Sequence, residues 1–392
     1  MGRLMKKLIV LVVTAIILAG CSETPTSDVY ENIAEVTTTT VAPETEATTV
    51  EATTTAAPET EAEEFVVTFE PDPQRLSALA TEKGMNMGTA FDLKYYKREP
   101  YYDAVTNEFN TITMENMMKW ASMNPAQDRY IYSGVDVAAY FVKEHGMKMR
   151  GHTLVWHQQL PEWLTKKSGQ WTKQELLDII GNYVENVVGH FKGTIYTWDV
   201  LNEIFEEDGS FRESMWYKYT GEDYIRLALR KARETDPDAI LIINDYSVAT
   251  INPKSDGLYN LVKQLQEEGV PIDGVGFQGH FILDGIDYDS MIENIERFEA
   301  LGLEVQLTEI DIRMASPITE EKLKAQGESY KRLMEIALDH NITTFVTWGV
   351  SDSVSWVPGF FIGYSTPLLF DRDYAPKPAY DGIFEALSNH EE

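Results

Sequence analysis

The stretch Y-T-W-D-V-L-N-E at residues 196–203 decides the fold, because it reads as a buried strand that ends on polar residues. Residues 194–200 carry the β-branched and aromatic side chains that are typical of a strand interior. The strand then stops at Asn202 and Glu203. Burying a carboxylate there is costly unless a partner or a reaction uses it. We therefore interpret Glu203 as a functional residue at one edge of a sheet.

A second stretch, V-Q-L-T-E-I-D at residues 305–311, repeats this design and carries Glu309. Cleavage of a glycosidic bond needs an acid that protonates the leaving oxygen and a second carboxylate that acts at the anomeric carbon. A single buried glutamate is also compatible with a structural ion pair. Two glutamates delivered by two strands favour catalysis by Glu203 and Glu309.

Strand-like and helix-like segments alternate regularly from residue 65 to the end of the chain. The expected strands are 85–91, 111–114, 148–154, 194–200, 239–244, 274–278, 304–308 and 344–348. The expected helices include 135–145, 173–191, 224–234, 257–268, 290–300, 320–339 and 378–387. Eight such units favour a single closed (β/α)8 TIM barrel of α/β class over 65–392. An open doubly wound sheet is less favoured because no glycine-rich phosphate loop follows the first strand.

In such a barrel the functional site lies where the strands end, at their carboxyl termini. Polar or aromatic residues follow all eight expected strands: Asp92; Glu115, Asn116 and Lys119; His152, Trp156, His157 and Gln159; Asn202 and Glu203; Asn244, Asp245 and Tyr246; Gln278 and His280; Glu309 and Asp311; Trp348 and Trp356. One such residue is easily explained as a loop contact. A ring of them at eight strand ends predicts an active site.

Histidines and tryptophans within this ring suggest different roles. His152, His157 and His280 lack the spacing of a metal-ligand set, so we expect no metal and no cofactor. Neutral histidines can instead hydrogen-bond a glutamate or a sugar. Trp156, Trp348 and Trp356 are expected to offer rings on which sugars stack, although tryptophan is also a common core residue.

The N-terminal residues predict export and a lipid anchor. Residues 1–20 have a basic start and an apolar run from 8 to 18, which is shorter than the roughly 20 residues of a membrane span and matches a signal peptide. Cys21, the chain's single cysteine, follows in L-A-G-C, which resembles the lipidation box of bacterial lipoproteins. An ordinary secretory signal is the alternative. Residues 21–64, rich in Thr, Glu and Ala, are expected to form a disordered linker.

The charge excludes several kinds of partner. Residues 1–20 carry +3 and residues 22–64 carry −11, so −22 of the total of −30 falls on residues 65–392. A domain this acidic is repelled by nucleic acids and by anionic membrane surfaces. We expect a neutral or weakly charged substrate, contact with a membrane only through Cys21, and a monomer.

With these motifs assembled, the chain resembles the family 10 glycoside hydrolases, the barrel-type endo-β-1,4-xylanases. The matching motifs are T-M-E-N-M-M-K-W (113–120), R-G-H-T-L-V-W-H-Q-Q-L-P (150–161), W-D-V-L-N-E (198–203), N-D-Y (244–246), G-F-Q-G-H (276–280), L-T-E-I-D-I (307–312), T-W-G-V-S-D-S-V-S-W (347–356) and P-L-L-F-D-R-D-Y-A-P-K-P-A-Y (367–380). Their order and spacing make the resemblance specific over nearly all of 65–387.

The resemblance implies a role for each matching position. Glu203 would be the general acid/base and Glu309 the nucleophile of a retaining reaction on xylan, and Asp311 would support the contact between His280 and Glu309. Asn202, Gln278 and His280 would surround the scissile bond, and Tyr246 would line the aglycone side. The glycone subsites would be lined by Glu115, Asn116, Lys119, His152, Trp156, Gln159, Trp348 and Trp356.

Two other functions stay open at this level. A β-1,4-glucanase, or a mixed xylanase and glucanase, differs only in whether the glycone pocket admits a hydroxymethyl group. A glycan-binding barrel without catalysis is the other alternative, and the presence of both glutamates disfavours it. For a retaining enzyme, the two carboxyl groups are expected to lie about 5–5.5 Å apart.

Overall fold

The computed structural model describes residues 74–390, and within them eight parallel strands close into a barrel. Neighbouring strands pair in chain order, and β9 closes the ring by pairing with both β1 and β8 through Phe345. The barrel strands are β1 (Asn86–Phe91), β2 (Thr111–Met114), β3 (Lys148–Val155), β4 (Ile195–Asn202), β5 (Ile240–Asp245), β6 (Gly274–Phe277), β8 (Glu304–Ala315) and β9 (Thr344–Thr347). The predicted (β/α)8 barrel is confirmed. The expected signal peptide, Cys21 and the linker lie outside the described residues.

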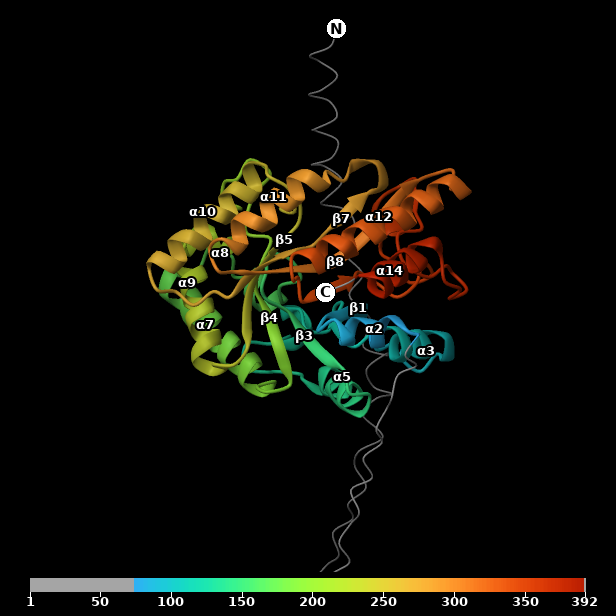
Figure 1. Ribbon diagram of the computed structural model, residues 1–392. Helices are drawn as coiled ribbons and strands as arrows, with labels where there is room; N and C mark the ends of the chain where they lie inside the picture. The colour runs from blue at the N-terminus through green and yellow to red at the C-terminus, as the bar shows by residue number, and fades with distance from the viewer. Residues whose placement is uncertain (1–73, 391–392) are drawn as a thin grey trace, which may run out of the picture. The chain divides into compact units, whose positions relative to one another are not determined.

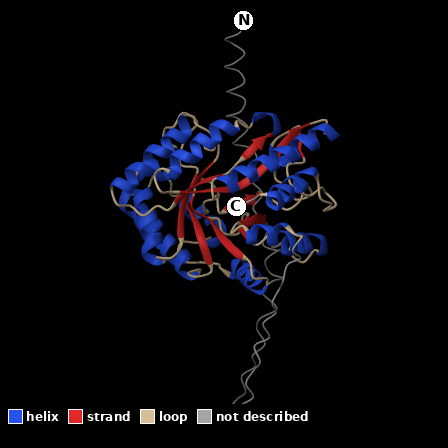
Figure 2. Cartoon of the chain, in the orientation of Figure 1, coloured by secondary structure: helices blue, strands red, loops and turns tan. Residues whose placement is uncertain are grey.

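Helices surround the strands on the outside, as Figures 1 and 2 show. The longer helices are α2 (Leu76–Glu82), α3 (Glu99–Glu108), α5 (Ser133–Glu144), α7 (Lys173–His190), α9 (Asp223–Thr235), α10 (Pro253–Glu267), α11 (Tyr288–Glu299), α12 (Glu320–Asp339) and α14 (Pro378–Asn389). Short helices occupy the loops: α4 (Trp120–Met123), α6 (Glu162–Thr165), α8 (Met215–Thr220), η3 (Leu283–Gly285) and α13 (Val357–Phe360). No helix within 74–390 has the length and apolarity needed to cross a bilayer.

Local sequence explains where several helices begin. At α7, Thr172 and Glu175 form a reciprocal capping box that satisfies otherwise unpaired backbone N–H groups. Asn252 caps α10 in the same way, and Pro253 occupies the first helical turn, where its missing N–H costs nothing. Each cap of this kind contributes on the order of 1 kcal/mol. These signals place the helices at the ends of loops that carry site residues.

One predicted strand is much longer than expected. Residues 304–308 were predicted, whereas β8 runs from Glu304 to Ala315. Beyond the barrel rim, β8 pairs with two short strands, β7 (His280–Ile282) and the antiparallel β10 (Tyr364–Ser365). Glu309 therefore lies inside a long paired strand rather than at the end of one, so its backbone is held on both sides.

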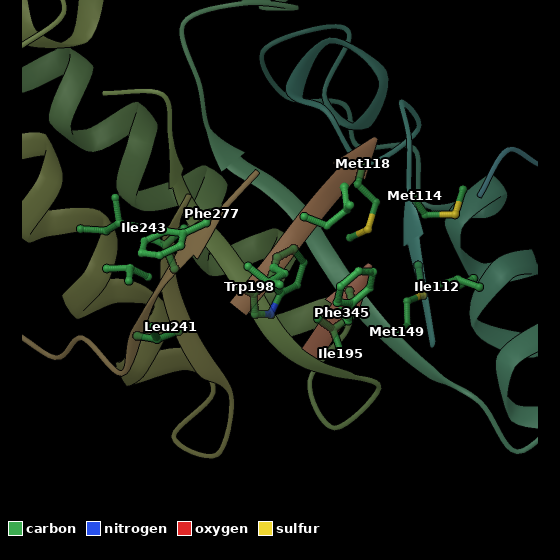
Figure 3. Packing of buried hydrophobic residues seen from close by; sticks show 14 of the residues in the cluster. Ile112, Met114, Met118, Met149, Ile195, Trp198, Leu241, Ile243, Phe277 and Phe345 are labelled. Atoms are coloured by element: carbon green, nitrogen blue, oxygen red, sulfur yellow. The ribbon is translucent and has the colours of Figure 1, made fainter. Parts of the chain in front are cut away.

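An apolar core fills the space around the strands, and Figure 3 shows part of it around Trp198. Trp198 is almost completely buried, and a Cβ on the adjacent Gly151 would lie 2.1 Å from its ring. Glycine is therefore required beside this tryptophan. Burying a large apolar side chain stabilises a fold by about 1.5–3 kcal/mol, so this layer makes the barrel rigid.

A polar layer crosses the barrel interior below the site. Arg150 on β3 is fully buried; its Nη2 donates to Asp199 Oδ1 of β4 at 2.7 Å and its Nε to Gln306 Oε1 of β8 at 3.1 Å. β3 and β8 lie on opposite sides of the ring, so this side chain spans the barrel. A buried charge is tolerated only with such complete pairing. This polar layer therefore connects β3, β4 and β8 directly below the site.

Candidate active site

Glu203 lies at a strained turn directly after β4. Its φ is +56°, a left-handed conformation that costs a residue with a side chain on the order of 1–3 kcal/mol. The turn is held from both sides, because the Glu203 N–H donates to the Asn244 carbonyl at 2.9 Å and the Glu203 carbonyl accepts from Arg212 Nε at 2.8 Å. Strain maintained in this way indicates that the direction of the Glu203 side chain matters.

Glu309 lies in β8 in a setting that favours its ionised form. It is 4% exposed, and its two oxygens accept hydrogen bonds from Asn244 Nδ2 at 2.8 Å and His280 Nε2 at 3.2 Å. Burial by itself would raise the pKa of Glu309, but the neighbouring His152 and the hydrogen bond from His280 bring this pKa below its usual value. Glu309 is thus held as a carboxylate, the form a nucleophile requires.

Asn244 reaches Glu309 because β6 leaves room for it. A Cβ at Gly276 would lie 2.3 Å from Asn244 Oδ1, so only glycine fits there. The same Oδ1 accepts from Thr308 Oγ1 at 2.6 Å, which directs Asn244 Nδ2 toward Glu309. The glycine of the G-F-Q-G-H motif therefore positions a hydrogen-bond donor.

His280 is a cation that lies beside Glu309. Its Nδ1 donates to Asp311 Oδ2 at 2.8 Å, and the same oxygen accepts from Trp356 Nε1 at 2.9 Å. Burial opposes a charge on His280, but the carboxylates of Asp311 and Glu309 outweigh it and raise the pKa of His280 to about 10. At neutral pH an imidazolium thus lies beside Glu309, in the arrangement expected for Asp311, His280 and Glu309.

The carboxylate of Glu203 is more open than that of Glu309, and its side-chain hydrogen-bond donor is uncharged. Its side chain is 13% exposed, and Gln278 Nε2 donates to its Oε1 at 3.3 Å. The side-chain amide of Asn202 lies 2.9 Å from that of Asn244 and 3.2 Å from that of Gln278, and on its other side 3.2 Å from Trp156 Nε1. The side-chain amides of Gln278, Asn202 and Asn244 thus form a continuous series between Glu203 and Glu309.

His157 adds an uncharged imidazole to the same side. Its Nδ1 lies 3.9 Å from Glu203 Oε2 and has no hydrogen-bond partner within the described residues. Burial, together with the positive charges of Arg212 and Lys254, lowers the pKa of His157 to about 3. His157 is therefore neutral across the working pH range, in contrast to His280.

Four residues expected in the glycone subsites form one cluster. Asn116 Oδ1 accepts from Lys119 Nζ at 3.1 Å and from Gln159 Nε2 at 3.4 Å, and the Lys119 ammonium lies 5.0 Å from the centre of a Trp156 ring. Burial raises the pKa of nearby Glu115, an effect that Lys119 opposes. These residues join the loops after β2 and β3 into one polar surface.

The tryptophans expected to stack on sugars differ in exposure. Trp348 is only 7% exposed, with its ring edge-on to His152 at 5.1 Å and to His280 at 6.4 Å. Most of the Trp348 ring therefore packs against the two histidines. Trp356 is more open, and its ring centre lies 4.9 Å from that of His280.

Tyr246, which is expected on the aglycone side, is held by Arg212: its hydroxyl oxygen accepts from Arg212 Nη2 at 2.8 Å.

The structure adds positioning roles that the sequence did not predict. Asp199 pairs with Arg150 and accepts from His152 Nδ1 at 2.9 Å, which orients that histidine toward Glu309. Asp199 and Asn244 both lie inside motifs quoted above, W-D-V-L-N-E and N-D-Y, so their place in those motifs was an available signal. Residues 74–390 contain no group of three His, Cys, Asp or Glu side chains placed to hold a metal ion.

A barrel rim with one buried, ionised glutamate and one more open glutamate defines a glycosidase of the two-carboxylate class. The chain belongs to glycosyl hydrolase family 10, whose model matches residues 75–386.

Named relatives agree with this assignment. Endo-1,4-beta-xylanase B of Thermotoga neapolitana is 43% identical over 329 residues, which cover 82% of this chain and 94% of that protein. An endo-1,4-beta-xylanase of Agaricus bisporus is 42% identical over 318 residues, covering 80% of this chain and 95% of that protein. Among solved structures, xylanase 10B of Thermotoga petrophila RKU-1 in complex with xylobiose superposes with a TM-score of 0.78 at 44% identity, covering 80% of this chain and 97% of that one.

Proposed function

We propose that this protein is an endo-1,4-β-xylanase that retains anomeric configuration, with Glu309 as nucleophile and Glu203 as general acid/base. The observation that carries the proposal is the asymmetry between the two glutamates. Glu309 is buried and accepts from the His280 cation and from Asn244, whereas the Glu203 carboxylate is more exposed and accepts from the uncharged amide of Gln278. The relatives named as xylanases support the choice of substrate.

The proposed cycle uses a change of charge on Glu309. Glu309 attacks the anomeric carbon while Glu203 protonates the departing oxygen, and a covalent glycosyl-enzyme forms. Glu309 is then an uncharged ester, and Glu203, now a carboxylate, takes a proton from the water that hydrolyses the ester. The fixed donors Asn244 and His280 stabilise Glu309 again as it leaves.

The test is the reaction on xylan beside cellulose, with product lengths resolved and the first anomer followed by proton NMR. We expect internal cleavage of xylan to short oligosaccharides and initial release of the β-anomer. An α-anomer released first would overturn retention. Equal turnover of cellulose would overturn the substrate preference, and binding without release of reducing sugar would indicate a glycan-binding barrel.

We further propose that the enzyme is exported, lipidated at Cys21 and held as a monomer at the outer side of the cell membrane. The support is the sequence alone: the apolar run, the L-A-G-C box and the acidic linker. Cys21→Ala should release the enzyme into the medium, whereas the native chain should partition into the detergent phase. Native enzyme found wholly free in the medium would contradict the anchor.

A further inference from the structure

We propose that the loop after β1, residues 92–98 (D-L-K-Y-Y-K-R, here the β1 loop), binds acidic sugar substituents of the glycan chain. The inference rests on the proposed function and extends it from a neutral backbone to anionic decorations such as uronic acids. No site residue expected from the sequence falls at Lys97 or Arg98. The β1 loop is therefore additional to the cleft described above.

The β1 loop lies on the catalytic rim. It follows the carboxyl end of β1, and the neighbouring strand end is tied to it because the Glu115 N–H donates to the Phe91 carbonyl at 3.1 Å. Lys94 lies close enough to Glu115 for its charge to oppose the burial-driven rise in that residue's pKa. The β1 loop thus continues the surface formed by Glu115, Asn116 and Lys119.

The charge of the β1 loop is opposite to that of the chain. The protein has 63 acidic and 33 basic residues, yet three of the five residues 94–98 are cations. Lys94 is paired with Asp92 at 2.8 Å. Lys97 and Arg98 are exposed and form no ion pair with another described residue. Two cations on the rim are therefore available to a ligand.

Aromatic rings hold these two cations in place. The Lys97 ammonium lies 5.3 Å from the centre of the Tyr96 ring, and the Arg98 guanidinium lies 4.5 Å from that of Tyr95. A cation over a ring gains about 0.5–1 kcal/mol at an exposed site, which restricts the side chain before a ligand arrives. Each cation lies over a face of its tyrosine ring. The loop therefore suits an anion better than the stacking of a neutral sugar.

Isolated carboxylates fit this surface better than a polyanion. The net charge of −30 repels nucleic acids and other continuous polyanions over the whole molecule. A mostly neutral glycan with occasional carboxylates is not repelled, and a guanidinium can bind a carboxylate through two hydrogen bonds. The expected ligand is therefore a uronic acid carried on, or next to, a sugar in the glycone half of the cleft.

The experiment compares K97Q/R98Q with the matched variant K192Q/K263Q. Lys192 lies between α7 and β4, at the end of the barrel opposite to the catalytic rim, and Lys263 lies within α10, so the control removes the same charge from exposed positions away from that rim. Each enzyme is assayed on linear neutral xylo-oligosaccharides and on the same chains carrying glucuronic acid, at low and at high salt.

We expect K97Q/R98Q to lower kcat/KM on the acidic chains by about 3- to 10-fold at low salt, since each exposed ion pair contributes little and is screened by salt. Its activity on neutral chains, and the activity of the control variant on both substrates, should stay within about twofold of the native enzyme. Equal kcat/KM of native enzyme and K97Q/R98Q on the acidic chains at low salt would overturn the inference. Failure of the native enzyme on both kinds of chain would instead overturn the proposed function.

Discussion

The two glutamates proposed to be catalytic have different electrostatic surroundings on one barrel rim. Glu309 contacts His280, whose pKa is raised to about 10, whereas Glu203 lies near His157, whose pKa is lowered to about 3. One histidine faces two carboxylates and the other faces the cations Arg212 and Lys254. Two histidines, each beside a glutamate, therefore differ in charge because their neighbours differ.

The largest expected effect comes from removing either glutamate. Glu309→Ala should lower turnover by about 10⁵-fold, because no covalent intermediate can form. Glu203→Ala should lose about 10²- to 10⁴-fold on xylan, the range of general acid–base catalysis. It should still form the glycosyl-enzyme from aryl glycosides whose leaving groups need no proton, seen as a burst of released phenol. Equal residual activity of the two variants on these aryl glycosides would contradict the division of roles.

A smaller effect separates the two histidines through pH. His280→Gln removes the imidazolium that lowers the pKa of Glu309, so this pKa should rise and the acidic limb of kcat/KM should move to higher pH. The matched variant His157→Gln removes a neutral ring and should leave the acidic limb in place. An equal shift of that limb in both variants would show that His280 does not act as a cation.

Gly276→Ala tests how Glu309 is supported without replacing a polar side chain. The added Cβ would displace the Asn244 amide, so the donor to Glu309 should be lost and kcat should fall by about 10-fold or more. Gly181→Ala on α7, where an added Cβ meets its nearest atoms at 4.0 Å, is the control and should keep full activity. Unchanged kcat in G276A would mean that Asn244 contributes nothing to catalysis.

The last expected effect is on stability. The raised pKa of His280 means that the folded protein binds this proton more tightly than the unfolded chain, whose histidine pKa is about 6.5. The stabilisation is complete below about pH 6.5 and is lost as the pH rises through about 10. The difference in Tm between native enzyme and His280→Gln should therefore shrink between these pH values. A constant difference in Tm would contradict the charged state of His280.

Most of the fold could be predicted because the strand and helix patterns are local. The eight barrel strands and seven helices lie where alternation placed them, with ends that differ by a few residues apart from β8. The extension of β8 to Ala315 depends on pairing with β7 and β10, which are distant in the chain. No local pattern encodes such pairing, so the prediction stopped at residue 308.

Side-chain roles were harder to predict than positions. Trp348 is predicted to contact a sugar, and the tertiary structure shows that its ring is 7% exposed and packs against His152 and His280. Asn244 carried no predicted role, because its contact with Glu309 depends on the space that Gly276 leaves on another strand. The exposure of a side chain such as Trp348 and the direction of a hydrogen-bond donor such as Asn244 depend on neighbours from several strands of the barrel.

The sequence by itself determined the barrel, the family and the two glutamates, because strand periodicity and motif order are properties of the linear chain. Only the tertiary structure decided how Glu309 is held ionised, since that depends on charges and hydrogen-bond donors brought together from β3, β5, β7 and β8. Electrostatic interactions act through space and grow stronger in a buried, low-dielectric site. The stretch ending at Glu203 therefore acquires its chemistry from residues that lie far from it in sequence.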